Sequence, residues 1–192
     1  MFGTGGPPEK SGGPPACVCG TLRRMDIRIR KALPAEYAPL GDITAQAYLR
    51  DALLDYGEED PYLPVLKDVA ARAAAAEVLV AVDGDRLLGG VTFVAGPGPV
   101  ADIARPGEAE IRALAVAHAA RGRGAGEALV RACLDRARAT PGCTAVVLSS
   151  QRAMRTAHRI YERLGFVRTP ERDWNPVPDL DDLTLLTYQL TL

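Results

Sequence analysis

Hydrophobic residues recur along the chain with two different periods. A period of two places side chains on one face of a strand, and spacing of three or four places them on one face of a helix. In "DIRIRKA", Ile27 and Ile29 alternate with arginines, which predicts a half-buried strand. "EVLVAVDGDRLLGGVTFVA" contains two apolar runs around Asp83 and Gly84, which predicts a hairpin.

The same patterns predict the remaining elements. Apolar residues are nearly continuous from Ile111 to Ala117, so residues 108–117 are expected to form a central strand. Ala125, Leu129 and Cys133 lie at helical spacing. The predicted helices cover residues 34–50, 63–76, 124–139 and 152–164, and the other predicted strands cover residues 144–150, 166–169 and 183–190. This order predicts an α/β fold, with a mixed sheet and helices on both of its faces.

The composition restricts the class of protein. The chain has 192 residues, of which 47% are hydrophobic, which is enough for one core. Its formal net charge of −1 provides no basic field, so no nucleic-acid partner is expected. No apolar run approaches the roughly 18 residues of a membrane span, and the N-terminus lacks an uninterrupted apolar signal segment. A cytoplasmic protein without membrane contact is therefore expected.

Residues 1–24 are predicted to be a disordered tail. The first 20 residues contain six Gly and four Pro, and such a segment buries too little apolar surface to offset the entropy of ordering. The periodic sequence begins at Met25, which could itself be the start of the protein. Residues 25–192 are expected to form one domain.

The four cysteines predict neither a metal site nor a disulfide. Cys17 and Cys19 are separated by one residue, whereas zinc and redox motifs use two. Cys133 lies on an apolar helical face, where a thiol acts as a small hydrophobe. Cys143 is likewise assigned to neither a disulfide nor a metal site, and no metal cofactor is expected.

A loop of glycine and arginine, Arg121-Gly122-Arg123-Gly124-Ala125-Gly126, follows a predicted strand and precedes a predicted helix. Free N–H groups at a helix N-terminus bind anions, and the helix dipole adds positive potential. Glycines allow close backbone approach, and arginines supply charge-assisted hydrogen bonds. The loop therefore predicts a phosphate-bearing ligand. The two common nucleotide motifs do not fit, because no Lys-Ser/Thr pair follows Gly126 and Glu127 occupies the place of a third glycine.

This loop matches the signature [QR]-x-x-G-x-[GA], and the chain thereby resembles the GNAT superfamily of N-acetyltransferases, whose loop binds the pyrophosphate of acetyl-coenzyme A. "EIRALAV" is similar to the family's fourth strand, and "AHRIYERLGFVR" to its last helix and the strand after it. The order of elements is similar across residues 25–192. The resemblance implies a GNAT-like fold, with a mostly antiparallel twisted sheet of about six or seven strands, and acetyl-CoA as cosubstrate.

The resemblance also implies where the cofactor binds. In the family, strands four and five splay apart and the pantetheine arm lies in the gap. By that match Val116 and His118 present main-chain groups to the arm, and an N–H near Ala115 or Val116 polarises the thioester carbonyl. The implied cofactor-binding residues are Val116, His118, Arg121, Gly122, Arg123, Gly124, Ala125 and Gly126.

Two residues are the implied catalytic groups. Tyr161 occupies the tyrosine position of the family stretch "A-x-x-x-Y-E-x-x-G-F", which implies that its phenol protonates the leaving thiolate. Its helical spacing with Met154 and Leu164 predicts a core residue as the alternative. Glu110 is the candidate base, because an amine with a pKa of about 10.4 is protonated at neutral pH. The alternatives for Glu110 are an ion pair with Arg112 and proton transfer through water.

One position departs from the family pattern. Many relatives carry an asparagine seven residues before the tyrosine, where this chain has Met154. The cofactor contact of that asparagine is expected to be lost, or to be taken over by Ser150 or Gln151. His118 and His158 are expected to be structural, because neither has a partner in sequence.

The family's acceptor site is shaped by the first two helices and their loop. In this chain the loop is acidic, with Asp51, Asp55, Glu58, Glu59 and Asp60. Such a cluster suits a cationic amine, and an ordinary solvated loop is the alternative. The acceptor is expected to be a small-molecule or peptide amine, and a homodimer is compatible with the sequence.

The predicted function is acetyl transfer from acetyl-CoA to a primary amine, by direct attack of the amine on the thioester. Two other functions stay open from the sequence. One is a CoA-binding sensor or interaction module that has lost turnover. The other is a structural domain whose arginine loop binds an acidic partner.

Overall fold

The computed structural model describes residues 1, 3, 26–177 and 183–192. The predicted tail at residues 1–24, with Cys17 and Cys19, lies almost wholly outside the described residues. The strands are β1 (Ile27–Lys31), β2 (Glu77–Asp83), β3 (Arg86–Val94), β4 (Glu108–Val116), β5 (Ala145–Gln151), β6 (Val167–Arg168) and β7 (Leu185–Thr191). The α-helices are α1 (Tyr37–Arg50), α2 (Leu63–Lys67), α3 (Val69–Ala75), α4 (Ala125–Ala139) and α5 (Arg155–Arg163).

The described strands form one seven-stranded sheet in the order β1-β2-β3-β4-β5-β7-β6. Only the pairing of β4 with β5 is parallel; the other pairs are antiparallel. The predicted mixed α/β fold with a mostly antiparallel sheet is therefore confirmed. The crossover between the two parallel strands runs through α4, as a parallel connection requires.

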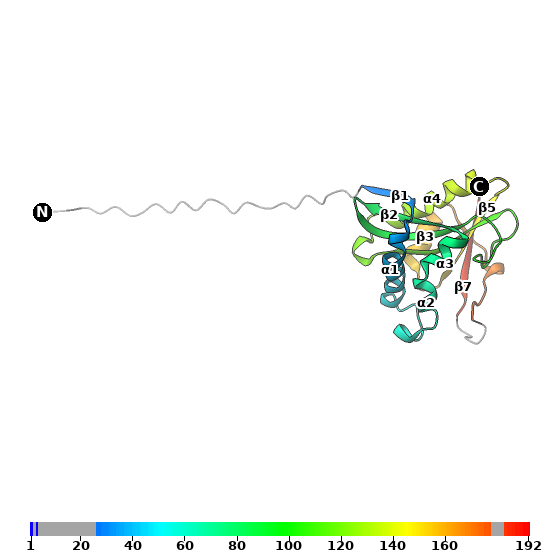
Figure 1. Cartoon of the computed structure of the whole chain (residues 1–192), viewed down its shortest axis with the longest axis horizontal. Coiled ribbons are helices and arrows are strands. Elements are labelled where there is room, and N and C mark those ends of the chain that lie inside the picture. The colour runs from blue at the N-terminus through cyan, green and yellow to red at the C-terminus, as the bar shows by residue number, and fades with distance from the viewer. Residues whose placement is uncertain (2, 4–25, 178–182) are drawn as a thin grey trace.

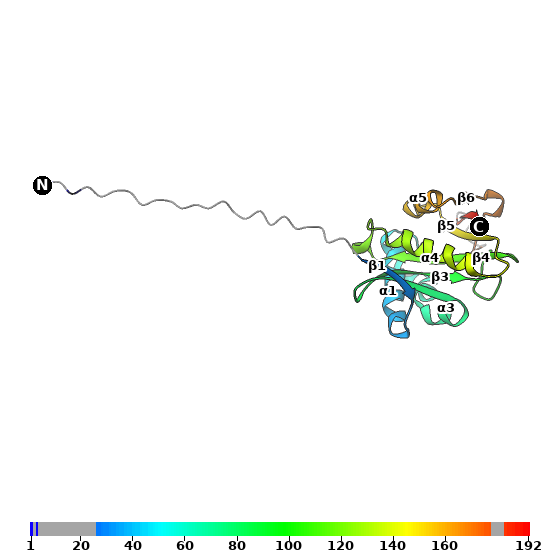
Figure 2. The same ribbon diagram turned by 90° about the horizontal axis from the view of Figure 1, so that it is seen from above.

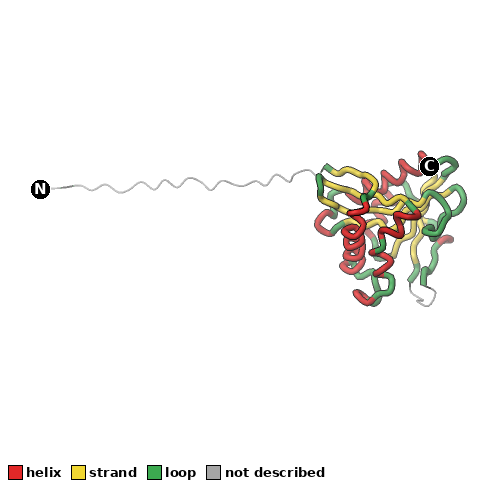
Figure 3. Tube along the Cα trace, in the orientation of Figure 1, coloured by secondary structure: helices red, strands yellow, loops and turns green. Residues whose placement is uncertain are grey.

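Helices cover both faces of the sheet. Helices α1 and α3 lie on one face, and α4 and α5 lie on the opposite face (Figures 1 and 2). Figure 3 shows the strands as a layer between these two groups of helices. Each face has its own core: the larger one is centred on α4 and includes Leu129 and Cys133, and the smaller one includes Leu40 and Val80. Burial raises the pKa of the Cys133 thiol to about 12, as expected for a cysteine that packs as a hydrophobe.

Strand β4 contains a bulge in its second half. Ala113 adopts a φ of 49°, which is unusual for a residue with a Cβ. The register with β3 shifts at this point, from Arg112↔Thr92 to Ala115↔Gly90, so two residues of β4 face one residue of β3. The bulge bends the second half of β4 at the centre of the sheet.

Two of the predicted elements differ in the structure. The predicted helix over residues 63–76 is broken at Asp68, which has non-helical backbone angles and accepts a hydrogen bond from the N–H of Ala71. Asp68 therefore caps a new helix instead of continuing the first. The predicted helix from residue 152 begins only at Arg155, and it ends before Gly165, whose φ is 93°.

Candidate functional site

The two parallel strands diverge in the middle of the sheet. Their pairing runs from Glu108↔Ala145 to Ile111↔Leu148 and ends there. Beyond this point β4 pairs only with β3, and β5 pairs only with β7, within the described strands. The second half of β4, after the bulge at Ala113, therefore borders a gap in the hydrogen-bond ladder. Its main-chain groups on the β5 side have no strand partner.

The glycine–arginine loop lies directly after this free stretch of β4. A short 3-10 turn, His118–Ala120, leads into it, and α4 begins at Ala125. Gly122 and Gly124 have φ values of 72° and 91°, a region that favours glycine. A Cβ added at either glycine would meet no heavy atom within 4 Å. The loop thus presents open space beside the N-terminus of a 15-residue helix, as anion binding requires.

Arg121 joins this loop to two other parts of the molecule. Its Nη1 lies 2.7 Å from Oδ1 of Asp51, at the end of α1. Its Nε donates to the carbonyl of Val116 at 3.4 Å, and its main-chain N–H donates to the carbonyl of His118 at 3.2 Å. The structure therefore brings Val116 and His118 into contact with the first residue of the arginine–glycine loop. The pairing with Asp51 was not predicted.

Tyr161 lies on α5 and is buried, with 5% exposure. Its ring packs against Phe166 and Tyr188, at centroid distances of 5.9 and 5.8 Å. Burial raises the pKa of the Tyr161 phenol far above its usual range, and the phenols of Tyr48 and Tyr188 raise it further. Tyr48 is on α1, on the opposite face of the sheet, so this interaction crosses the sheet. Tyr161 is thus a core residue whose phenol stays protonated at neutral pH.

Glu110 is completely buried on β4, just before the strands diverge. Its carboxylate accepts hydrogen bonds from three consecutive main-chain N–H groups of the β3–β4 loop, at 3.0 Å from Asp102, Ile103 and Ala104. Burial raises the pKa of this carboxyl, and the N–H donors offset the rise only in part. The Nε of Arg112 lies 3.6 Å away. Glu110 therefore anchors a loop in addition to lying beside the gap.

Arg112 was foreseen as a partner of Glu110, but the residues that surround Arg112 were missed by sequence reasoning. Arg112 forms an ion pair with Asp102 and also donates to the carbonyl of Val100. Tyr48 and Tyr62 lie on the same side, with ring centroids 6.4 Å apart, and burial raises the pKa of both phenols while Arg112 lowers it. Strand alternation places Arg112 on the face of Glu110, but no sequence pattern signals the two tyrosines.

Beside Met154, the side chains of Ser150 and His158 form a polar pair. The Oγ of Ser150 lies 3.2 Å from Nε2 of His158 and donates to the sulfur of Met154 at 3.3 Å. His158 also packs against the ring of Tyr188, and burial lowers the pKa of its imidazole. The expected structural role of His158 agrees with this packing, although its partner Ser150 was not foreseen. Gln151 instead donates to the carbonyl of Leu53, at 3.0 Å.

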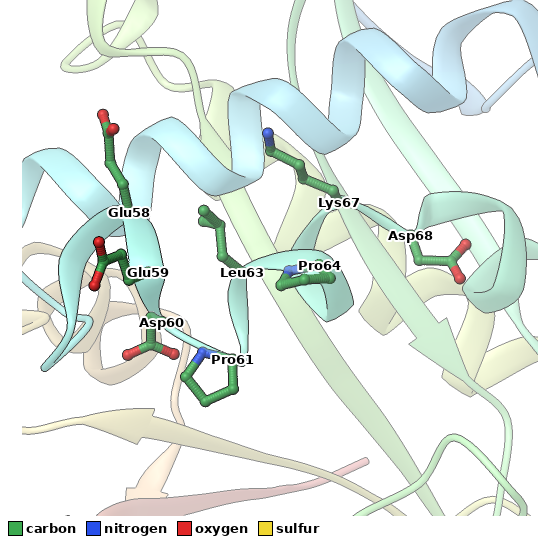
Figure 4. Close-up of a pocket in the computed structure, with 8 residues that line it drawn as sticks. All are labelled: Glu58, Glu59, Asp60, Pro61, Leu63, Pro64, Lys67 and Asp68. Carbon is green, nitrogen blue, oxygen red and sulfur yellow. The ribbon is translucent and has the colours of Figure 1, made fainter.

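The acidic loop does not form a single cluster. Asp60 is buried and accepts from the N–H groups of Tyr56 and Tyr62, so it stabilises the turn. Glu58 and Glu59 lie beside Asp60 at one end of an open hollow, and Lys67 and Asp68 lie at the other end (Figure 4). None of the predicted cofactor or catalytic residues lines this hollow.

Neither a metal site nor a membrane-spanning helix is present among the described residues. No group of three or more His, Cys, Asp or Glu side chains is placed where it could hold a metal ion. None of the described helices combines the length and the apolar character that crossing a bilayer requires.

Comparisons with known proteins agree on one family. Residues 42–166 match the family model described as the acetyltransferase (GNAT) family. The fold is similar to that of yncA from Salmonella typhimurium, assigned as an acetyltransferase and solved with its cofactor acetyl-CoA, at 25% identity and a TM-score of 0.64, covering 86% of this chain and 94% of that one. A GCN5-related N-acetyltransferase from Kribbella flavida gives 25% identity, a TM-score of 0.63, and coverage of 86% and 98%. A search of curated proteins found no match.

Proposed function

Because the chain belongs to the GNAT family of acetyltransferases, we propose that it is an acetyl-CoA-dependent N-acetyltransferase. The observation that carries this proposal is the divergence of β4 and β5 directly before an open glycine–arginine loop and a helix N-terminus. These features provide a stretch of main-chain groups without a strand partner for a pantetheine arm, followed by an anion site for a diphosphate.

The residues of the loop fit the diphosphate of acetyl-CoA. The N–H groups at the start of α4 point out of the helix, because the first turn has no intrahelical acceptors for them. Arg121 and Arg123 add positive charge on either side of Gly122. The free space above Gly122 and Gly124 leaves room for phosphate oxygens. Val116 and His118 supply main-chain groups at the adjoining end of the gap.

The proposed reaction forms an N–C bond and breaks the C–S bond of the thioester. A neutral amine attacks the acetyl carbonyl, and a main-chain N–H near Ala115 or Val116 stabilises the oxyanion. The tetrahedral intermediate then expels the coenzyme A thiolate. Glu110, directly or through a water molecule, takes the ammonium proton before the attack. Tyr161 gives its proton to the expelled thiolate, and the proton released by the new amide nitrogen returns to the Tyr161 phenolate. Burial raises the pKa of both groups: it keeps the Tyr161 phenol protonated at neutral pH while making it a weaker acid, and it makes Glu110 a stronger base.

The proposed acceptor is a primary amine that approaches from the side of α1 and α2. Glu110, Arg112 and Asp102 face this side, and two of the three are anionic. The exposed carboxylates of Asp55, Glu58 and Glu59 extend the negative charge outward. A cationic amine, free or in a peptide, is therefore favoured over an anionic one.

The first test is a thermal-shift titration with acetyl-CoA, coenzyme A and ATP. A ligand at a hundred times its Kd stabilises the folded state by about 2.7 kcal/mol, which gives a measurable shift in Tm. We expect both coenzyme A forms to shift the Tm and ATP to have little effect. The absence of any shift would contradict the proposal. A shift without turnover in a screen of amines would favour the alternative of a non-catalytic CoA-binding module.

A further inference from the structure

The proposed diphosphate loop and the proposed acceptor side are joined by one ion pair. Nη1 of Arg121 lies 2.7 Å from Oδ1 of Asp51, and 70 positions of sequence separate the two residues. Arg121 opens the glycine–arginine loop, whereas Asp51 is the C-cap of α1. The arginine expected to bind phosphate is therefore held by a carboxylate from the acceptor side.

A second contact ties the same segment to the other side of the gap. The carbonyl of Leu53 accepts a hydrogen bond from Nε2 of Gln151, the last residue of β5, at 3.0 Å. The segment Asp51–Leu53, here called the bridging segment, thus contacts the β4 side through Arg121 and the β5 side through Gln151. Its central residue, Ala52, has a φ of 50°, which costs about 1 kcal/mol for a residue with a Cβ.

We propose that Asp51 is a positioning residue that holds the bridging segment across the gap until the diphosphate of the cofactor takes Arg121 from it. This inference rests on the proposed function. The ion pair is partly exposed, with side-chain exposures of 34% for Arg121 and 40% for Asp51. Exposed pairs are weak and are screened by salt. A diphosphate carries more negative charge than one carboxylate and also receives hydrogen bonds from the helix N-terminus, so it competes well for the guanidinium.

The proposal predicts in which direction Asp51 changes the affinity for the cofactor. If the cofactor must displace Asp51 from Arg121, then Asp51 weakens cofactor binding, and by reciprocity the cofactor weakens the hold on the bridging segment. If Arg121 instead binds both anions at once, Asp51 orients the arginine and strengthens cofactor binding. Removing the carboxylate separates these two arrangements.

The test compares Asp51→Asn with Asp55→Asn by calorimetric titration with coenzyme A. Asp55 is exposed in the same acidic loop and, among the described residues, forms no ion pair or side-chain hydrogen bond, so its variant removes the same charge without the contact. We expect Asp51→Asn to tighten coenzyme A binding about two- to fivefold and Asp55→Asn to change it much less. Unchanged or weaker binding by Asp51→Asn, or an equal gain in both variants, would overturn the proposal.

A double-mutant cycle with Arg121→Ala locates the effect. In the Arg121→Ala background, Asp51→Asn is expected to give no gain in coenzyme A affinity, because the ion pair no longer exists. A gain that persists there would overturn the proposal. If wild-type protein fails to bind coenzyme A at all, the proposed function fails; if it binds and the cycle shows no coupling of the expected sign, only the role of Asp51 fails.

Hydrogen exchange provides a second readout on the bridging segment. The N–H groups of Ala52 and Leu53 donate to Leu49 and Tyr48 at 3.2 and 3.0 Å. Coenzyme A is expected to speed exchange at these two amides in the wild-type protein, and Asp51→Asn is expected to show fast exchange without it. Slower exchange on binding, or no change, would overturn the proposal.

Discussion

The carboxylate of Glu110 accepts a hydrogen bond from the main-chain N–H of Ala104 at 3.0 Å, which joins β4 to the loop that precedes it. The N–H groups of Asp102 and Ile103 converge on the same oxygen, also at 3.0 Å. Three donors directed at one buried anion fix the course of this loop beside β4. The proposed base is therefore also part of the architecture of the site.

Glu110→Gln is expected to destabilise the protein. The amide oxygen can accept from the three N–H groups that converge on one carboxylate oxygen, but the NH2 group then replaces the other oxygen, where it faces Nε of Arg112 and the N–H of Asp102 as donor against donor. The expected loss is about 1–3 kcal/mol in the free energy of unfolding, measured with urea at pH 7. Glu171→Gln, at an exposed position, serves as the control. Equal stability of the two variants would mean that Glu110 does not hold the loop.

The pH dependence of turnover tests Glu110 as a base. A base must be deprotonated, and the pKa of Glu110 is raised by burial, so the rate kcat/KM should rise with pH along a limb that lies above the usual carboxyl pKa of about 4.3. Glu110→Gln should remove this limb and lower kcat. A variant that keeps both the limb and the rate would assign proton removal to water alone.

The stability of the protein should depend on pH through Glu108. Its carboxylate accepts two hydrogen bonds from Arg172, at 2.8 and 2.9 Å, and the side chains of Arg172 and Glu108 are only 8% and 13% exposed. Burial raises the pKa of the Glu108 carboxyl, but the hydrogen bonds from Arg172 and from the N–H of Arg105 outweigh it, and the folded-state pKa lies below its usual value. The pair therefore stabilises the folded state above the unfolded pKa of about 4.3, and this contribution is lost as pH falls through the lowered pKa.

Glu108→Gln should accordingly cost about 2 kcal/mol at pH 7 and much less at pH 3. The measurement is the difference in unfolding free energy from the wild type at the two pH values. Glu127→Gln is the control, because Glu127 pairs with Arg131 and Arg163 on an exposed face of α4, where the pairs are screened by solvent. If the loss of unfolding free energy in Glu108→Gln does not change with pH, the lowered pKa assigned to Glu108 is contradicted.

Local patterns predicted the elements well because period and turn chemistry are local properties. The hairpin at Asp83–Gly84 and the strand from residue 108 are present as expected. The break at Asp68 shows where a pattern misleads. The apolar residues before it and the alanine-rich sequence after it favour one helix, yet the aspartate side chain accepts from a free N–H and starts a second helix.

Contacts between distant segments were not predictable in this way. The bulge at Ala113 places an alanine at positive φ, which no propensity favours, so it arises from the pairing of β4 with β3. The pairs Arg121–Asp51 and Gln151–Leu53 join residues 70 and 98 positions apart. The family signature located the loop, but only the structure placed it beside the end of α1.

Alanine at Gly124 should lower Tm and affinity for coenzyme A, whereas alanine at Gly126 should not. At Gly124 the φ of 91° strains a Cβ by about 1 kcal/mol, and the methyl group points into the open space assigned to phosphate. At Gly126 the Cβ would contact Ile160 at 3.4 Å and Val116 at 3.6 Å, inside the protein, and alanine favours the helix. We expect Gly124→Ala to lower both Tm and coenzyme A affinity, and Gly126→Ala to keep both within experimental error or raise Tm slightly. Equal loss of affinity in both variants would contradict the proposed position of the diphosphate.

The role of Tyr161 can be separated from its packing by removing one oxygen atom. Tyr161→Phe keeps the ring contacts with Phe166 and Tyr188. If the phenol protonates the leaving thiolate, kcat should fall about 10²-fold or more while the affinity for coenzyme A stays nearly constant, because the lost interaction exists only in the transition state. Tyr188→Phe removes a hydroxyl from the same buried cluster and is the matched control. Equal, small effects of the two variants on kcat would mean that Tyr161 is a core residue without a catalytic role. A large loss of kcat confined to Tyr161→Phe cannot come from packing, because both variants keep the aromatic rings in place.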